Sequence, residues 1–153
     1  MIKKIILKIF FIAILNIYSV YLFSQNITIK GRVIAEDLNY LPYVYIMIQD
    51  TINVGKTNNK VFFQITIPIS ETKLKFDFVG MDPAIIELTN NTNTIEVIML
   101  FSCSYDFISL KRAERKRKRR FKKIPALHNL AYKKRIFKTK KACYKLKFFS
   151  YIE

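Results

Sequence analysis

Apolar and polar residues alternate along several short stretches between residues 26 and 100. In the segment TKLKFDFVG, Leu74, Phe76 and Phe78 alternate with charged residues, and residues 60–67 show the same period of two. Successive side chains of a strand point to opposite sides of a sheet, so this pattern is typical of strands with one buried face.

Seven segments of this kind are predicted to form strands, and turn-forming residues separate them. They are residues 27–35, 43–48, 53–57, 60–67, 72–80, 84–88 and 94–100. Short strands between polar turns are typical of a β-sandwich. The gaps are too short for the crossover helices of an α/β fold. The sequence therefore predicts an all-β, seven-stranded sandwich over residues 26–100, and this part is expected to fold alone.

Four motifs occur in order within this region. Their residues are Gly31 and Val33; Leu41, Pro42 and Val44; Thr57, Asn58, Phe63 and Ile65; and Leu74, Phe76, Phe78, Val79 and Gly80. This order resembles the carboxypeptidase regulatory-like domain, a transthyretin-like (prealbumin-like) β-sandwich found in exported bacterial proteins. The resemblance covers residues 27–100 and implies a non-catalytic accessory or interaction module.

One position departs from the family pattern. The family usually has a glycine two residues before the Phe of the third motif, where this chain has Val61. Glycine permits a turn with positive φ, which a β-branched residue strongly disfavours. The turn before Phe62 is therefore expected to differ from the family's turn or to start at a shifted position.

Residues 1–25 have the layout of a secretory signal peptide. Lys3 and Lys4 precede an apolar run over residues 9–23, and Ser24 offers a small residue at the cleavage point. The alternative is an uncleaved anchor in the inner membrane, although a spanning helix needs about 20 apolar residues. Either interpretation predicts export, and cleavage predicts a periplasmic or outer-membrane-associated protein.

Charge divides the remaining chain into two units. Residues 26–110 contain 6 basic and 9 acidic residues, whereas residues 111–153 contain 18 basic and 2 acidic residues. Such asymmetry indicates units with different roles. The predicted organisation is a signal peptide (1–25), a sandwich (26–100) and a basic, partly helical C-terminal extension (101–153).

The extension begins with the basic run KRAERKRKRRFKK at residues 111–123, whose composition favours a helix. Pro125 either ends this run or opens a short second helix that includes Leu127, Leu130 and Ala131. From Tyr144 onward, apolar residues alternate with lysines, which predicts an edge strand or an aromatic and basic strip.

The densest cations of the extension are the candidate binding residues Arg115, Lys116, Arg117, Lys118, Arg119 and Arg120. The predicted partner is an anionic surface, either phospholipid or lipopolysaccharide, or an unidentified envelope protein. Two other interpretations remain open for the run: a solvated helix that tunes solubility, and a nucleic-acid-binding arm. The leader argues against the arm, because an exported protein meets little nucleic acid. A regulatory subunit of a separately encoded peptidase is a further alternative.

No catalytic, cofactor-binding or metal-ligating set is recognisable in the sequence, and no small-molecule substrate is indicated. His128 is the only histidine, and a zinc peptidase needs several ligands around its metal. Cys103 and Cys143 are the two cysteines. In an oxidising compartment they are candidates for a disulfide, with two separate thiols as the alternative.

Overall fold

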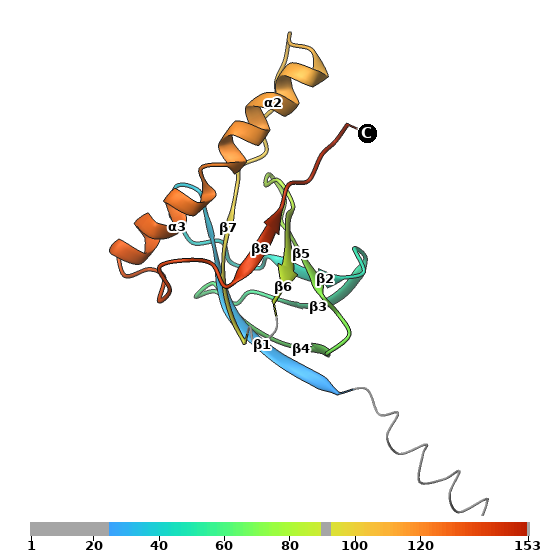
Figure 1. The fold of residues 1–153 in the computed structure, drawn as a ribbon, viewed down its shortest axis with the longest axis vertical. Helices are drawn as coiled ribbons and strands as arrows, with labels where there is room; N and C mark the ends of the chain where they lie inside the picture. Colours follow the sequence, from blue (N-terminus) through green and yellow to red (C-terminus); the bar gives the residue numbers. More distant parts are fainter. Residues whose placement is uncertain (1–24, 90–92, 153) are drawn as a thin grey trace, which may run out of the picture.

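The computed structural model describes residues 25–89 and 93–152. The expected signal peptide lies outside the described residues, apart from Gln25. The described part is mostly β-structure, arranged as two sheets with two helices toward its C-terminal end (Figure 1). Among residues 25–89 and 93–152, neither helix combines the length and the apolar character that crossing a membrane requires.

The two sheets differ in size and in strand direction. The smaller sheet has the order β4-β1-β7, in which β1 pairs antiparallel with β4 and parallel with β7. The larger sheet has the order β3-β2-β5-β6-β8, and all of its pairs are antiparallel. The strands are β1 (Asn26–Ala35), β2 (Tyr45–Ile48), β3 (Ile52–Lys56), β4 (Phe62–Pro68), β5 (Lys73–Asp77), β6 (Ala84–Leu88), β7 (Thr94–Met99) and β8 (Tyr144–Lys147).

The core between the sheets confirms the alternation seen in the sequence. Leu74 and Phe76 on β5 are fully buried, while Lys73, the first residue of this strand, is exposed. The ring of Phe76 lies 5.6 Å from that of Phe63, which belongs to the opposite sheet. The inward-facing residues of both sheets thus form one continuous apolar cluster.

The outer face of the three-stranded sheet is covered mainly by the C-terminal helix α3 (Ile124–Lys133) and the segment after it, and only the end of the preceding helix α2 (Leu110–Phe121) contributes to this contact. Ile34 and Ile98 point away from the inter-sheet core but are fully buried, because they pack in a second cluster with Phe137 and residues of α3. The basic extension is therefore packed against the sandwich. It is not a separate arm.

The extension contributes one strand beyond the seven segments predicted within residues 26–100. Each predicted segment of residues 26–100 contains a strand, and β8 from the extension adds an eighth within the described residues. β8 pairs with β6 at the edge of the larger sheet, so the edge-strand interpretation of this segment is confirmed. Its Tyr144 enters the inter-sheet core and donates a hydrogen bond of 2.6 Å to the carbonyl oxygen of Glu96 on β7.

The helical part of the extension also follows its sequence signals. The basic run forms α2, and Pro125 lies in the first turn of α3, where its missing N–H is not needed. Pro125 therefore opens a second helix, as one of the two sequence alternatives predicts.

The turn before Phe62 is expected from the sequence to differ from the family's turn or to start at a shifted position, and the backbone at Val61 does not show such a difference. Val61 adopts a φ of 60° although it is β-branched, so the turn keeps the backbone conformation for which glycine is usual. Two interactions hold it there. The Val61 side chain is buried, and the Asn58 side-chain oxygen accepts hydrogen bonds from the backbone N–H groups of Lys60 and Phe62. Packing and the Asn58 side chain thus outweigh the local preference of valine.

Candidate functional site

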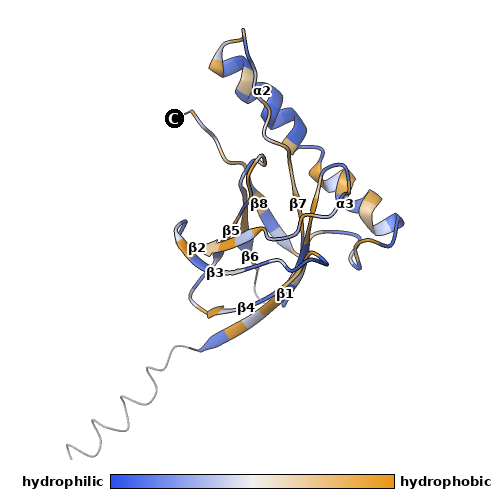
Figure 2. Ribbon diagram, turned by 180° about the vertical axis from the view of Figure 1, so that it is seen from behind, coloured by the Kyte–Doolittle hydropathy of each residue, from blue (hydrophilic) through white to orange (hydrophobic). Residues whose placement is uncertain are grey.

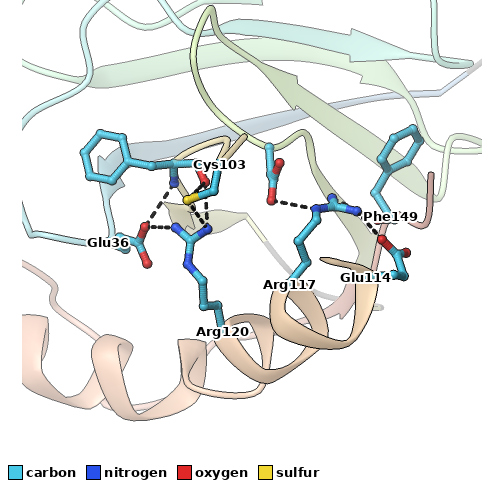
Figure 3. Close-up of polar contacts among 8 residues, drawn as sticks. Glu36, Cys103, Glu114, Arg117, Arg120 and Phe149 are labelled. Carbon is cyan, nitrogen blue, oxygen red and sulfur yellow. Dashed lines mark hydrogen bonds and ion pairs between the residues drawn. The ribbon is translucent and has the colours of Figure 1, made fainter. Parts of the chain in front are cut away.

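Helix α2 presents two different faces to its surroundings. Figure 2 shows that α2 is hydrophilic along most of its length, whereas α3 is mixed. Figure 3 shows Arg117 and Arg120 reaching from the same side of α2 toward the sandwich. Residues three apart share a helix face, so this spacing places both guanidinium groups against the β-structure.

Arg117 is buried in the contact between α2 and the sandwich. Its side chain is 7% exposed, and its Nε lies 3.2 Å from the carboxylate of Asp82. Its other nitrogens donate to Glu114 at 2.7 Å and to the carbonyl oxygen of Phe149 at 3.1 Å. The ring of Tyr151 lies 4.0 Å from the guanidinium carbon and covers it. Arg117 is therefore a structural link between α2, the turn after β5 and the C-terminal segment.

The pKa values of Glu114 and Tyr151 are shifted in this contact. Burial raises the pKa of Glu114, but hydrogen bonds with Ser150, Arg117 and the backbone of Tyr151 and the positive charge of Arg117 together lower it, so its pKa falls below the ordinary 4.5. Burial, followed by the negative charge of Asp82, raises the pKa of Tyr151. Glu114 therefore stays ionised, as an ion pair with Arg117 requires.

Arg120 makes the second link. It forms an ion pair with Glu36, which follows β1, and donates to the carbonyl oxygen of Phe101 at 3.0 Å. It also donates to the sulfur of Cys103 (Figure 3). Burial lowers the pKa of Arg120, but hydrogen bonds to Glu36 and Tyr105 and the negative charge of Glu36 together raise it above its ordinary value. The guanidinium thus remains a permanent cation that joins α2 to the end of β1.

The six predicted binding residues therefore do not form one surface. Arg117 and Arg120 face the sandwich, and four of the six are exposed: Arg115, Lys116, Lys118 and Arg119. The physical reason is the helical period, which turns every third or fourth residue of a basic run toward the same neighbour. Exposed basic residues of the same run extend this outer face: Lys111, Arg112, Lys122 and Lys123.

Two apolar side chains are exposed at the start of α2. Phe107 is fully exposed and has a positive φ of 63°, and Leu110 is 76% exposed. Figure 1 shows that this end of α2 projects beyond the sheets. The ammonium group of Lys116 lies 5.6 Å from the ring of Tyr105, so aromatic and basic groups are mixed at this end. The projecting end therefore combines apolar side chains with positive charge.

The candidate disulfide is not formed. Cys103 follows the bridge between Met81 and Phe101 near the start of β6, whereas Cys143 precedes β8 and lies beside Thr89 at the other end of β6. A disulfide needs Cα atoms within about 7 Å of each other. The two cysteines lie at opposite ends of a strand, so the pairing considered from the sequence is wrong for this structure.

His128 lies on α3 and is almost fully buried, with its ring 4.8 Å from that of Phe137. Burial lowers the pKa of His128, although the backbone of Lys140 and the charge of Glu96 oppose this. Within residues 25–89 and 93–152, no group of three or more His, Cys, Asp or Glu side chains is placed to hold a metal ion.

Sequence reasoning missed the partners of the two inward-facing arginines. Glu114 and Arg117 are three residues apart, so their pairing could have been read from helical spacing. Asp82 and Glu36 are distant in sequence and carried no signal that links them to α2. No protein-family model matches the chain, and no curated protein is similar to it in sequence.

Proposed function

We propose that this protein is an exported, non-enzymatic β-sandwich module that attaches to anionic surfaces of the cell envelope through the outer face of α2. The observation that carries the proposal is the projecting end of α2. There, exposed Phe107 and Leu110 adjoin a row of outward-facing cations, on a helix that Arg117 and Arg120 fix to the sandwich.

The geometry favours a lipid-like surface over a purely electrostatic partner. A cation near an anionic membrane contributes about 1 kcal/mol, and full burial of a Phe or Leu side chain contributes about 1.5–3 kcal/mol. Interfacial segments bind membranes by combining these two terms. Phosphate contacts with nucleic acid would use the cations but would leave Phe107 and Leu110 without a role.

The fixed orientation of α2 also supports this proposal. Arg117 and Arg120 each contact two or more groups of the sandwich or of the C-terminal segment, so α2 is held at both positions. A surface whose charges are already positioned loses less conformational entropy when it binds. The inward-facing arginines thus organise the outward-facing cations.

For the sandwich we propose a carboxypeptidase regulatory-like, transthyretin-like module. Three residues of the resembling motifs meet in this structure: the buried hydroxyl of Thr57 donates to the carbonyl oxygen of Leu41 at 3.0 Å and accepts from the N–H of Val44 at 2.9 Å. Val61 has positive φ where the family has glycine. Both observations support the resemblance, and the resemblance implies an accessory role. A regulatory subunit of a separately encoded peptidase is the variant of this role that copurification would reveal.

Cosedimentation with vesicles tests the proposal. The protein is expected to bind vesicles that contain phosphatidylglycerol and to ignore vesicles of phosphatidylcholine alone at low salt. The test variant replaces four outward-facing residues with Gln: Arg115, Lys116, Lys118 and Arg119. Removing four charges is expected to weaken binding by up to about 4 kcal/mol. The matched control removes four exposed charges from the sandwich and is expected to bind like wild type: Lys30, Lys56, Lys60 and Lys73.

A second variant separates lipid from nucleic acid. Phe107→Ser with Leu110→Ser keeps every cation but removes the apolar end of α2. Vesicle binding is expected to fall by about tenfold or more, which corresponds to about 1.4 kcal/mol. If vesicle binding is unchanged while duplex DNA binds tightly and loses affinity steeply with salt, the nucleic-acid arm is the better explanation.

A further inference from the structure

A pocket of about 670 Å³ lies between the start of α3 and the segment that leads into β8. Its apolar lining comes from both sides, with Ile124 and Pro125 on α3 and with Ala142 and Leu146 opposite. The size falls within the usual range of small-molecule sites, about 300–1,000 Å³. The pocket adjoins the outer face of α2 at Lys122, but its lining contains none of Arg115, Lys116, Lys118 and Arg119.

The wall formed by residues 138–143 is held in place by hydrogen bonds. The buried carboxylate of Glu96 on β7 accepts from the backbone N–H groups of Lys138 and Thr139 and from the Thr139 hydroxyl, at 2.8–3.0 Å. At the other end, the Thr89 hydroxyl donates to the carbonyl oxygen of Cys143 at 2.8 Å. The pocket is therefore preformed, as ligand sites usually are.

Two polar side chains in the lining, the buried His128 and the half-buried Asn129, have buried atoms without a hydrogen-bond partner of normal geometry in the portion that the structure describes. Among the described residues, no partner of normal geometry reaches either ring nitrogen of His128 or the side-chain oxygen of Asn129. Burying a polar group without a partner is costly, so such groups in a native structure call for an explanation. His128 is 2% exposed, and its lowered pKa keeps the ring neutral, with one donor and one acceptor nitrogen.

The charge around the pocket has a single sign. Within the described part of the chain, the lining contains Lys122, Lys140 and Lys141 and no carboxylate. We propose that this pocket binds a single-chain anionic amphiphile, with its alkyl chain on the apolar lining and its carboxylate or phosphate head at the three lysines. Such a ligand fits both features of the site, and its polar head brings hydrogen-bonding atoms to a lining in which His128 and Asn129 lack partners.

Isothermal titration of the full exported chain with decanoate, below its micelle concentration, tests this proposal. One decanoate is expected to bind per chain, and decanol to bind at least tenfold more weakly because it lacks the charge. Decyl phosphate is the second arm. Tighter binding of decanoate points to fatty acids as the source, and tighter binding of decyl phosphate points to phosphorylated lipids. Equal affinity for decanol and decanoate would overturn the anionic assignment.

Ala142→Phe places a ring in the pocket at an exposed position and is expected to weaken decanoate binding at least tenfold. Ala126→Phe is the matched control, because Ala126 is exposed on α3 outside the lining. Unchanged decanoate binding by a folded Ala142→Phe variant would overturn the proposal.

A charge variant keeps the test valid if Ala142→Phe fails to fold. Lys140→Gln with Lys141→Gln is expected to weaken decanoate binding about fivefold, since partly exposed ion pairs contribute modestly. The matched pair Lys133→Gln with Lys134→Gln removes exposed charges at the end of α3 and is expected to leave affinity unchanged. Equal losses in the two pairs would show a general charge effect and overturn the site.

Vesicle binding distinguishes this inference from the proposed function. Ala142→Phe is expected to bind phosphatidylglycerol vesicles like wild type, because the outer face of α2 is unchanged. The four-residue Gln variant of α2 is expected to bind decanoate like wild type. Loss of decanoate binding in that α2 variant would mean that decanoate binds α2, which would overturn the pocket.

Discussion

The two apolar clusters of this protein lie on opposite faces of the same three-stranded sheet, and they are built differently. The inter-sheet cluster is formed almost entirely by alternating aliphatic and aromatic residues of strands. The outer cluster is small and joins the sheet to α3, while buried charges complete the neighbouring contact of α2. One face of the sheet is thus specified by local hydrophobic period, whereas the other is covered by apolar residues of a distant segment that ion pairs of α2 help to hold in place.

The largest expected effect comes from deleting residues 101–153. The deletion exposes Ile34, Ile98 and Leu100, and it removes Tyr144 from the inter-sheet core. Burial of a large apolar side chain contributes about 1.5–3 kcal/mol, so the loss for these four residues is on the order of 6–12 kcal/mol. This is comparable to the whole stability of a small domain, about 5–15 kcal/mol.

The packing therefore changes the expectation from the sequence that residues 26–100 fold alone. Circular dichroism and urea unfolding of the shortened chain would measure the effect. A cooperative transition close to that of the full chain would show that the outer cluster contributes little, and that the two faces are energetically independent.

Arg117→Gln tests the buried charges of the outer contact. Asp82 would remain buried beside α2 without its ion pair, and breaking a buried pair typically costs 3–5 kcal/mol. We expect the free energy of unfolding to fall by about 3 kcal/mol. Arg119→Gln is the control and is expected to change it by less than about 0.5 kcal/mol, because Arg119 is exposed. Equal effects of the two substitutions would mean that α2 is not held by Arg117.

Substitutions at Val61 measure how far side-chain packing within the sandwich outweighs an unfavourable backbone conformation. Val61→Ala keeps the unfavourable positive φ and removes buried methyl groups, which should cost about 1–2 kcal/mol. Val61→Gly removes one more carbon but relieves backbone strain of about 1–2 kcal/mol. We therefore expect the glycine variant to cost no more than the alanine variant in thermal or urea unfolding. A clearly less stable glycine variant would show that the turn is not strained.

The smallest expected effect concerns pH. Burial lowers the pKa of His128, so the folded protein binds fewer protons than the unfolded chain just below the ordinary value of 6.5. Stability is then fully present above pH 6.5 and falls as the pH drops below it, by at most about 1.4 kcal/mol per unit. Glu114 has a pKa below 4.5, so its ion pair persists through this range.

Urea unfolding at pH 7.5, 6.5 and 5.5 would measure this slope. His128 is the only histidine of the chain, so His128→Phe should remove the dependence. A slope of the same size in His128→Phe would assign the proton to another group, and would argue that the outer cluster tolerates a charged ring.

The sequence predicted the parts of the fold that depend on local periodicity. Alternation located the strands on which Phe63 and Phe76 meet, and Pro125 marked the start of α3. It did not place the extension, because Ile34 and Ile98 look like ordinary strand residues until a helix is known to cover them. The full burial of these two residues on the outer face is the observation that shows the extension to be part of the fold.

The candidate site was predictable in composition but not in geometry. The basic run identified α2, yet a continuous row of Lys and Arg conceals which side chains face inward. What distinguishes Arg117 and Arg120 from the other cations of the run is their ion pairs with Asp82 and Glu36. These two carboxylates come from distant segments of the chain. The pocket beside His128 had no local signal, because its walls come from residues 121–129 and 140–146, and Glu96 on the distant strand β7 holds the segment before the second wall.

The position of β8 also determines when the larger sheet can be completed during folding. The edge of β6 is completed by residues 144–147, which are synthesised after the other strands of this sheet. Until they arrive, β6 presents unpaired backbone groups, a recognised cause of intermolecular pairing. Once β8 is in place, the new edge carries Lys145 and Lys147, and charged residues discourage another strand from adding. The nascent chain therefore depends on β8, or on a chaperone, to cover this edge of the larger sheet.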